Sequence, residues 1–252
     1  MSTDFLPGKF VWFEHESQDI DAAMRFYDGL FGWHSERVAM EGETYPVIQR
    51  GDQAIGGYRL SQPNVQPQWI SYLSVPDVDA SHDAAVAAGS TTLMAPTNYG
   101  SVGRACAIKD PTGAPLCLWK GARPDPADVE ETPTGGWFWN ELWTSDDARA
   151  LAFYQSSFGF TAESMPMGAM TYYVLKKDGQ RRAGLCRTVN PQAKSLWLPY
   201  VAVADCDATA EKVAGLGGQL LSAPRDVPGI GRFSLCADPT GAAIAFIRPQ
   251  ST

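Results

Sequence analysis

The sequence lacks several features that mark common classes of protein. No apolar run approaches the roughly 20 residues of a membrane-spanning helix. Residues Met1–Lys9 contain neither a basic segment nor an apolar one, so no secretory signal is predicted. Basic residues number 20 against 28 acidic ones, and the resulting charge of −8 disfavours binding to nucleic acid or to an anionic membrane. We therefore expect a cytoplasmic protein without a nucleic-acid or membrane partner.

Cysteine and histidine are also scarce. The five cysteines include no Cys-x-x-Cys pair, which argues against a disulfide framework and against a zinc ribbon. The three histidines, His15, His34 and His82, all lie in the first half of the chain, and we expect each to be packed or solvated. His15 should face the opposite side of its strand from Glu14, because side chains alternate along a strand. No glycine-rich phosphate loop joins a strand to a helix, so a nucleotide site of that kind is not predicted.

What the chain does contain is an internal repeat. Phe26-Tyr27 and Phe31-Gly32 return 127 residues later as Phe153-Tyr154 and Phe158-Gly159. Asp110-Pro-Thr-Gly113 returns 128 residues later, at Asp238–Gly241, and in both places Pro and Gly predict a tight turn. A repeat of this length indicates a duplicated domain rather than a solenoid.

The organisation of each copy follows from this repeat. We expect one domain over residues 8–121, a linker rich in Pro and Gly over 122–135, and a second domain over 136–249. The pattern near the start predicts a strand at 10–16 and an amphipathic helix at 19–31, with Asp19 as N-cap and Gly32 at its end. Three strands follow, broken at Glu41-Gly42 and Gly51-Asp52, and then the β-α-β-β-β order restarts. Helices that alternate with three-strand runs indicate an α+β fold.

These motifs, in this order of elements, resemble the vicinal oxygen chelate superfamily, which includes glyoxalase I, extradiol dioxygenases and bleomycin-resistance proteins. The most similar subgroup is that of two-domain, glyoxalase-like proteins labelled hydroxylases. The resemblance covers almost the whole chain, twice. It implies an α+β tandem duplication in which four β-α-β-β-β units form two curled, mixed-sheet cups.

The resemblance also implies positions for metal ligands, which are His, Glu or Gln in the family. In this sequence those positions hold side chains that mostly cannot bind a metal: Trp12 and Trp139, Ile70 and Leu198, Cys117 and Ala245. We therefore predict no resident metal and no other cofactor. A divalent ion held by Glu14, Glu16 and Cys117 is the alternative.

The first strand of each copy instead predicts a small-molecule site. Trp12, Glu14 and Glu16 alternate along one strand, and Trp139, Glu141 and Trp143 along its repeat, so each set should face one way. Indole faces and a carboxylate suit a flat aromatic or cationic ligand. Four more residues are expected to line the cups. Tyr72 and Tyr200 would add to the aromatic walls, and Arg104 and Arg232 would pair with the carboxylates or bind a ligand carboxylate.

Three functions agree with these residues. The first is metal-free binding of a small molecule, as in bleomycin-resistance proteins. The second is a glyoxalase- or dioxygenase-type enzyme with an atypical metal site. The third is a metal-independent isomerase, lyase or hydroxylase-like enzyme in which Glu14 or Glu141 acts as acid or base. The duplication favours a monomer with an internal pseudo-twofold axis over a dimer.

Overall fold

The computed structural model describes residues 5–40, 43–168, 170–190 and 192–250; the predicted strand break at Glu41-Gly42 lies outside these ranges. Packing divides the chain into two compact units. Unit 1 comprises Met1–Val11, Ile70–Asp128 and Trp139–Trp197, and unit 2 comprises Trp12–Trp69, Val129–Phe138 and Leu198–Thr252. Each unit therefore combines parts of both sequence copies.

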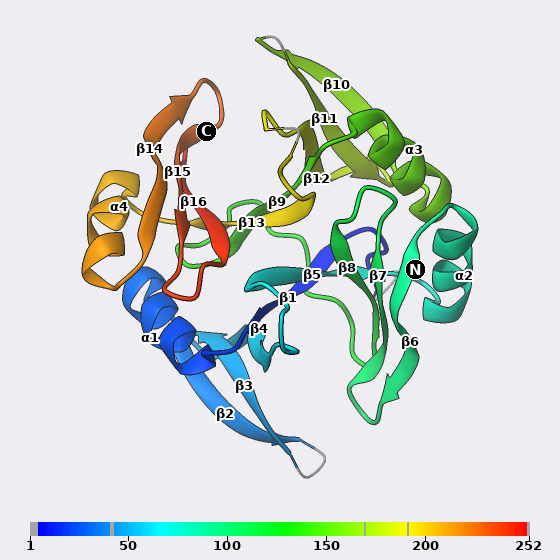
Figure 1. Ribbon diagram of the computed structural model, residues 1–252, viewed down its shortest axis with the longest axis horizontal. Coiled ribbons are helices and arrows are strands. Elements are labelled where there is room, and N and C mark those ends of the chain that lie inside the picture. Colours follow the sequence, from blue (N-terminus) through cyan, green and yellow to red (C-terminus); the bar gives the residue numbers. More distant parts are fainter. Residues whose placement is uncertain (1–4, 41–42, 169, 191, 251–252) are drawn as a thin grey trace. The chain divides into compact units, whose positions relative to one another are not determined.

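The order of elements confirms four β-α-β-β-β modules (Figure 1). The first copy contains β1 (Phe10–Ser17), α1 (Ile20–Phe31), β2 (His34–Met40), β3 (Glu43–Arg50), β4 (Gln53–Leu60), β5 (Gln68–Ser74), α2 (Val78–Ala87), β6 (Thr91–Tyr99), β7 (Gly103–Lys109) and β8 (Pro115–Gly121). The second contains β9 (Trp137–Thr144), α3 (Asp147–Phe158), β10 (Thr161–Met167), β11 (Met170–Lys177), β12 (Gln180–Arg187), β13 (Leu196–Ala202), α4 (Cys206–Gly215), β14 (Gln219–Val227), β15 (Gly231–Ala237) and β16 (Ala243–Pro249).

The first helix begins and ends where the sequence predicts. The Asp19 carboxylate accepts a hydrogen bond from the Ala22 amide at 2.9 Å, which caps α1. Gly32 ends α1 with φ of 70°, a left-handed conformation that glycine adopts without a Cβ clash. The repeat preserves both caps, because Asp146 and Gly159 play the same parts at α3.

The sheets are mixed, as predicted. In the first module β3 is antiparallel to both β2 and β4, whereas β4 runs parallel to β1. The third module repeats this arrangement with β10, β11, β12 and β9. The parallel pairing places the first strand of a module next to its last one. Glu14 on β1 is thereby opposite Gly57, and Glu141 on β9 is opposite Gly184.

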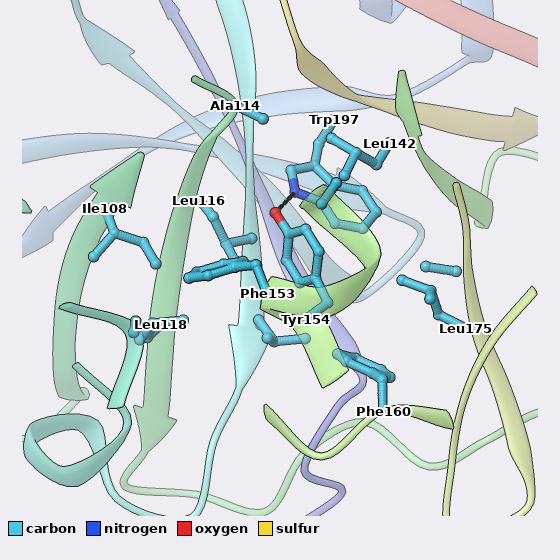
Figure 2. Close-up of a cluster of buried hydrophobic side chains, with 14 of the residues drawn as sticks. Ile108, Ala114, Leu116, Leu118, Leu142, Phe153, Tyr154, Phe160, Leu175 and Trp197 are labelled. Atoms are coloured by element: carbon cyan, nitrogen blue, oxygen red, sulfur yellow. Dashed lines mark hydrogen bonds between the residues drawn. The ribbon is translucent and has the colours of Figure 1, made fainter. Parts of the chain in front are cut away.

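The core of unit 1 explains the repeated Phe-Tyr motif (Figure 2). Phe153 and Tyr154 of α3 are buried in a cluster with Leu116 and Leu118 of β8. The Trp197 indole N–H donates to the Tyr154 hydroxyl at 3.0 Å, which satisfies two polar atoms inside the apolar core. In unit 2 the Trp69 indole donates in the same way to Tyr27. None of the helices in the described ranges is long and apolar enough to span a membrane.

The Asp-Pro-Thr-Gly segments form the predicted turns. Asp238 Oδ1 accepts hydrogen bonds from the backbone amides of Thr240, Gly241 and Ala242 at 2.8 to 3.1 Å. The sequence did not reveal a second role of this carboxylate. Its Oδ2 atom is bound to His15 Nε2 at 2.6 Å and accepts from the Tyr27 hydroxyl at 3.0 Å. His15 is fully buried, so of the two expected outcomes, packed or solvated, the structure shows the packed one.

Candidate ligand-binding sites

The first candidate site lies in unit 2, on one face of β1, β3 and β4. We call it the Glu14 cluster: Trp12, Glu14, Glu16, Tyr45 and Arg59. The Tyr45 hydroxyl donates to Glu14 Oε1 at 2.7 Å, and the Trp12 indole N–H lies 3.4 Å from the same hydroxyl. Arg59 Nε is 3.0 Å from Glu14 Oε2, and another guanidinium nitrogen is 3.3 Å from Glu16 Oε1. One arginine thus joins both carboxylates.

The charged groups of the Glu14 cluster differ in their exposure to solvent. The Glu14 side chain is only 4 % exposed, whereas the Arg59 side chain is 43 % exposed. Such a buried carboxylate needs charged or hydrogen-bonding partners to offset its lost hydration. Burial raises the pKa of Tyr45 well above its usual value, and the nearby Glu14 charge raises it further. Tyr45 therefore acts as a hydrogen-bond donor and not as a base.

The second candidate site lies in unit 1, on the equivalent face of β9, β11 and β12. We call it the Glu141 cluster: Trp139, Glu141, Trp143, Tyr172 and Cys186. The Trp139 indole donates to the Tyr172 hydroxyl at 2.9 Å, the Trp143 indole donates to Glu141 Oε2, and Tyr172 lies near enough to Glu141 for that carboxylate to affect its pKa. Burial, followed by the Glu141 charge, raises the pKa of Tyr172. A Trp–Tyr–Glu arrangement therefore occurs in both units.

Glycines on β4 and β12 make room for the two tyrosines. A Cβ atom built on Gly57 would overlap the Tyr45 hydroxyl, and one built on Gly184 would overlap the Tyr172 hydroxyl. The Gly184 Cβ would also approach Trp139 Nε1 to 2.9 Å. Gly57 is thus explained by the cluster next to it, whereas a Cβ atom on the neighbouring Gly56 would meet the backbone oxygen of Phe13 at 2.5 Å.

Substitution of Gly184 by alanine will disturb the Glu141 cluster. The new methyl group displaces the Tyr172 hydroxyl from Glu141, so we expect a loss of about 1–3 kcal/mol in the free energy of unfolding. Urea denaturation followed by circular dichroism measures this loss. Gly215→Ala is the matched control, because nothing lies within 4 Å of the Cβ position there. Equal stability of the two variants would show that the packing around Gly184 can accommodate a methyl group without loss of stability.

Several predicted site residues come together as expected. Trp12, Glu14 and Glu16 share one cluster, and Trp139, Glu141 and Trp143 share the other. Sequence reasoning missed Tyr45, Tyr172 and Arg59. The offset of 127 residues relates the two tyrosines, so the repeat itself carried the signal. Nothing marked Arg59, because its position in the second copy holds Cys186.

Arg104 and Arg232 are bound elsewhere than expected. The Arg104 guanidinium makes two hydrogen bonds to Asp79, at 2.6 and 2.7 Å, and Arg232 binds Asp207 in the same way at 2.7 and 2.8 Å. These hydrogen bonds lower the pKa of both aspartates. The observed ion-pair partner of Glu14 is Arg59. A direct role of Arg104 or Arg232 in ligand binding stays a prediction.

The two tyrosines predicted to line the cups lie in separate surroundings. Tyr72 is half-buried, with its ring centre 6.1 Å from that of Trp119, and Tyr200 is buried at the same distance from Phe233. Tyr72 belongs to unit 1, which contains the Glu141 cluster of the second sequence copy. Tyr200 belongs to unit 2, which contains the Glu14 cluster of the first copy. Their predicted part in ligand binding therefore stays a prediction.

The described residues do not fit a family-type metal site. The side chains at the implied positions are indoles, alkyl groups and one thiol, of which only the thiol of Cys117 is a metal donor. Within the described ranges no three His, Cys, Asp or Glu side chains are grouped so that they could hold an ion. Arg59 binds one oxygen of Glu14 and one of Glu16, and their other oxygens accept hydrogen bonds from Tyr45 and Gln68. No mechanism is therefore derived through a metal.

Comparison of the sequence with known families gives two matches. Residues 12–119 match the glyoxalase-like domain. Residues 138–246 match the glyoxalase/bleomycin resistance protein/dioxygenase superfamily. Both matched segments begin at or near the first strand of a copy and end near its last strand.

Similar proteins extend over the full length of the chain. The "Putative glyoxylase CFP32" of Mycobacterium tuberculosis (strain CDC 1551 / Oshkosh) is 35% identical over 254 residues, covering 98% of this chain and 97% of that protein. The anthracycline biosynthesis protein DnrV of Streptomyces peucetius is 29% identical over 266 residues, covering 97% and 94%.

Solved structures share the fold at low sequence identity. The Mn(II)-bound glyoxalase from Novosphingobium aromaticivorans has a TM-score of 0.67 at 17% identity, with 96% of this chain and 82% of that chain covered. The 2,2',3-trihydroxybiphenyl 1,2-dioxygenase from Sphingomonas wittichii strain RW1 has a TM-score of 0.66 at 13% identity, with 95% and 90% covered.

Proposed function

The chain belongs to the glyoxalase/bleomycin resistance protein/dioxygenase superfamily, and we propose that it acts there as a binder of small organic molecules that needs no resident metal. The same fold supports binding proteins and enzymes, so function has to be argued from the site. The site here offers indole faces, phenol donors and carboxylates in place of a set of metal ligands.

The observation that carries this proposal is the Trp–Tyr–Glu arrangement in both units. In each cluster a half-buried tryptophan donates to a tyrosine that lies beside a buried glutamate, and in the Glu14 cluster the tyrosine donates to that glutamate. The indole offers a flat apolar face, and the carboxylate attracts a hydrogen-bond donor or a positive charge. A planar ring that carries an amino group satisfies both requirements.

An acid–base enzyme is the second candidate, and the burial of the two glutamates favours it. As whole residues, Glu14 is 3 % and Glu141 is 8 % exposed. A carboxylate with so little water around it can serve as a general base when a substrate proton lies within reach. The exchanges Glu14→Gln and Glu141→Gln separate the two functions. An enzyme loses turnover in these variants, whereas a binder of an aromatic amine has no turnover to lose and shows only weaker binding.

The proposal is tested by titration with proflavine, a planar aromatic amine that is cationic at neutral pH. The protein is first treated with EDTA, and binding is followed by proflavine fluorescence and by calorimetry. We expect saturable binding in the micromolar range that Mn(II) or Zn(II) leaves unchanged. The absence of binding, or binding that requires an added metal ion, would contradict the proposal.

A further inference from the structure

The two clusters occupy the same place in their modules but differ along one row of the sheet. In unit 1 this row crosses four strands in register: Met165 is opposite Tyr172, Tyr172 is opposite Cys186, and Cys186 is opposite Trp143. Side chains that are directly opposite in neighbouring strands lie on the same face. Sulfur atoms and aromatic rings therefore form a continuous row, which we call the Met165 row.

Two of the four corresponding positions in unit 2 are charged. Val38 is opposite Tyr45, and Arg59 is opposite Glu16. Arg59 takes the place of Cys186, and Glu16 takes the place of Trp143. The ion pairs of Arg59 with Glu14 and Glu16 make this face polar, and the Arg59 side chain is 43 % exposed to water. A flat apolar ring would have to displace that hydration and cover a charged network.

The apolar face of unit 1 continues beyond the Met165 row to the end of the β10–β11 hairpin. Met167 is opposite Met170, and both lie on the same face as Met165 because strand side chains alternate. The three methionines are 42 %, 45 % and 38 % exposed. Exposed methionines are flexible and polarisable, which allows them to fit aromatic rings of different outline.

From this difference we infer that the two clusters have unequal roles. The Met165 row and the Glu141 cluster bind the planar aromatic part of the ligand, Met167 and Met170 cover its outer edge, and Glu141 accepts a hydrogen bond from a donor on the ring. The complementary charge of Glu141 selects rings that carry an amino group over acidic rings. The Glu14 cluster, closed by Arg59, does not bind aromatic rings. This assignment rests on the proposed binding function and adds to it the site and the ligand class.

The assignment is tested with proflavine and single variants of the whole chain. Trp143→Leu removes the indole from the row, and we expect proflavine to bind roughly 10-fold more weakly, as the loss of one stacking partner implies. Met165→Ser changes an exposed rim residue and is not expected to disturb folding, so it tests the row even if the Trp143 variant is unstable. We expect it to weaken binding roughly threefold. Val38→Ser, at the equivalent position of unit 2, is the matched control and should leave the affinity unchanged.

The outcomes separate the assignment from the function on which it rests. The assignment is supported if one proflavine binds per chain, if Trp143→Leu and Met165→Ser weaken that binding, and if Val38→Ser leaves it unchanged. Two equivalent sites per chain, or an equal loss from Val38→Ser and Met165→Ser, would overturn it while leaving the binding function in place. If the parent protein does not bind proflavine at all, both the proposed function and the assignment are wrong.

Discussion

Replacement of Asp238 by alanine will lower the free energy of unfolding by about 4 kcal/mol. The Oδ1 atom of this buried carboxylate holds the Asp-Pro-Thr-Gly turn through three backbone amides, and its Oδ2 atom binds His15 and Tyr27. Alanine would leave these donors without their acceptor in a region closed to water. Burial alone would raise the pKa of Asp238, but the His15, Thr240 and Tyr27 hydrogen bonds and the His15 charge outweigh it and leave the pKa lowered.

The duplication supplies a matched comparison for this variant. Asp110 holds the equivalent turn in unit 1 and accepts from Tyr154 at 2.9 Å, but the position of His15 is occupied there by Leu142. Asp110→Ala should therefore cost about 1 kcal/mol less than Asp238→Ala, since the histidine interaction is missing. Asp226→Ala, at an exposed ion pair with Arg232, should cost less than about 1 kcal/mol. Urea denaturation measures the free energy of unfolding of the three variants and so tests this order. A loss for Asp238→Ala no larger than for Asp226→Ala would contradict this account of the turn.

Replacement of His15 will also have a large effect. His15→Ala leaves a cavity and removes the 2.6 Å interaction with Asp238, so we expect a loss of about 3 kcal/mol. His15→Leu copies the side chain that the second sequence copy has at this position, and it refills most of the volume. We expect it to cost about half as much as the alanine variant. If both variants are as stable as the parent, the buried His15–Asp238 pair does not stabilise unit 2.

The same pair also determines a part of the acid stability. Because the pKa of Asp238 is lowered in the folded protein, its contribution is fully present above the unfolded-state value of about 3.9 and is lost as the pH falls through the folded-state pKa. Without His15 the pKa of Asp238 rises towards or above the unfolded-state value, so the variant loses less stability than the parent as the pH falls and its profile is flatter. Denaturation of the parent and of His15→Leu between pH 7 and pH 3 measures this difference. Parallel profiles would show that His15 does not lower the Asp238 pKa.

The sequence was sufficient to predict the modules and one face of each cluster. The period-2 pattern places Trp12, Glu14 and Glu16 on one face, and the structure confirms that face through the contacts of Tyr45 and Arg59. The caps of α1 also follow from local chemistry, because an aspartate and a glycine suit the two ends of a helix. These features depend on neighbours within a few residues along the chain.

Features that depend on packing between distant segments could not be predicted in the same way. The pairing of Glu14 with Arg59 requires the parallel register of β1 and β4, which no local pattern reveals. The second role of Asp238 requires contact between residues more than 200 positions apart in the chain. The repeat identifies which residues are equivalent, but it does not show that each compact unit combines modules from both copies.

The claim at the centre of this account is that the protein binds an aromatic amine without a resident metal. Native mass spectrometry of untagged protein, purified without chelator and then mixed with proflavine, tests it most directly. We expect the mass of the chain plus one proflavine, with no excess from a divalent ion even after incubation with Mn(II) or Zn(II) and desalting. A retained divalent ion, or a proflavine adduct that forms only when such an ion is present, would contradict the account.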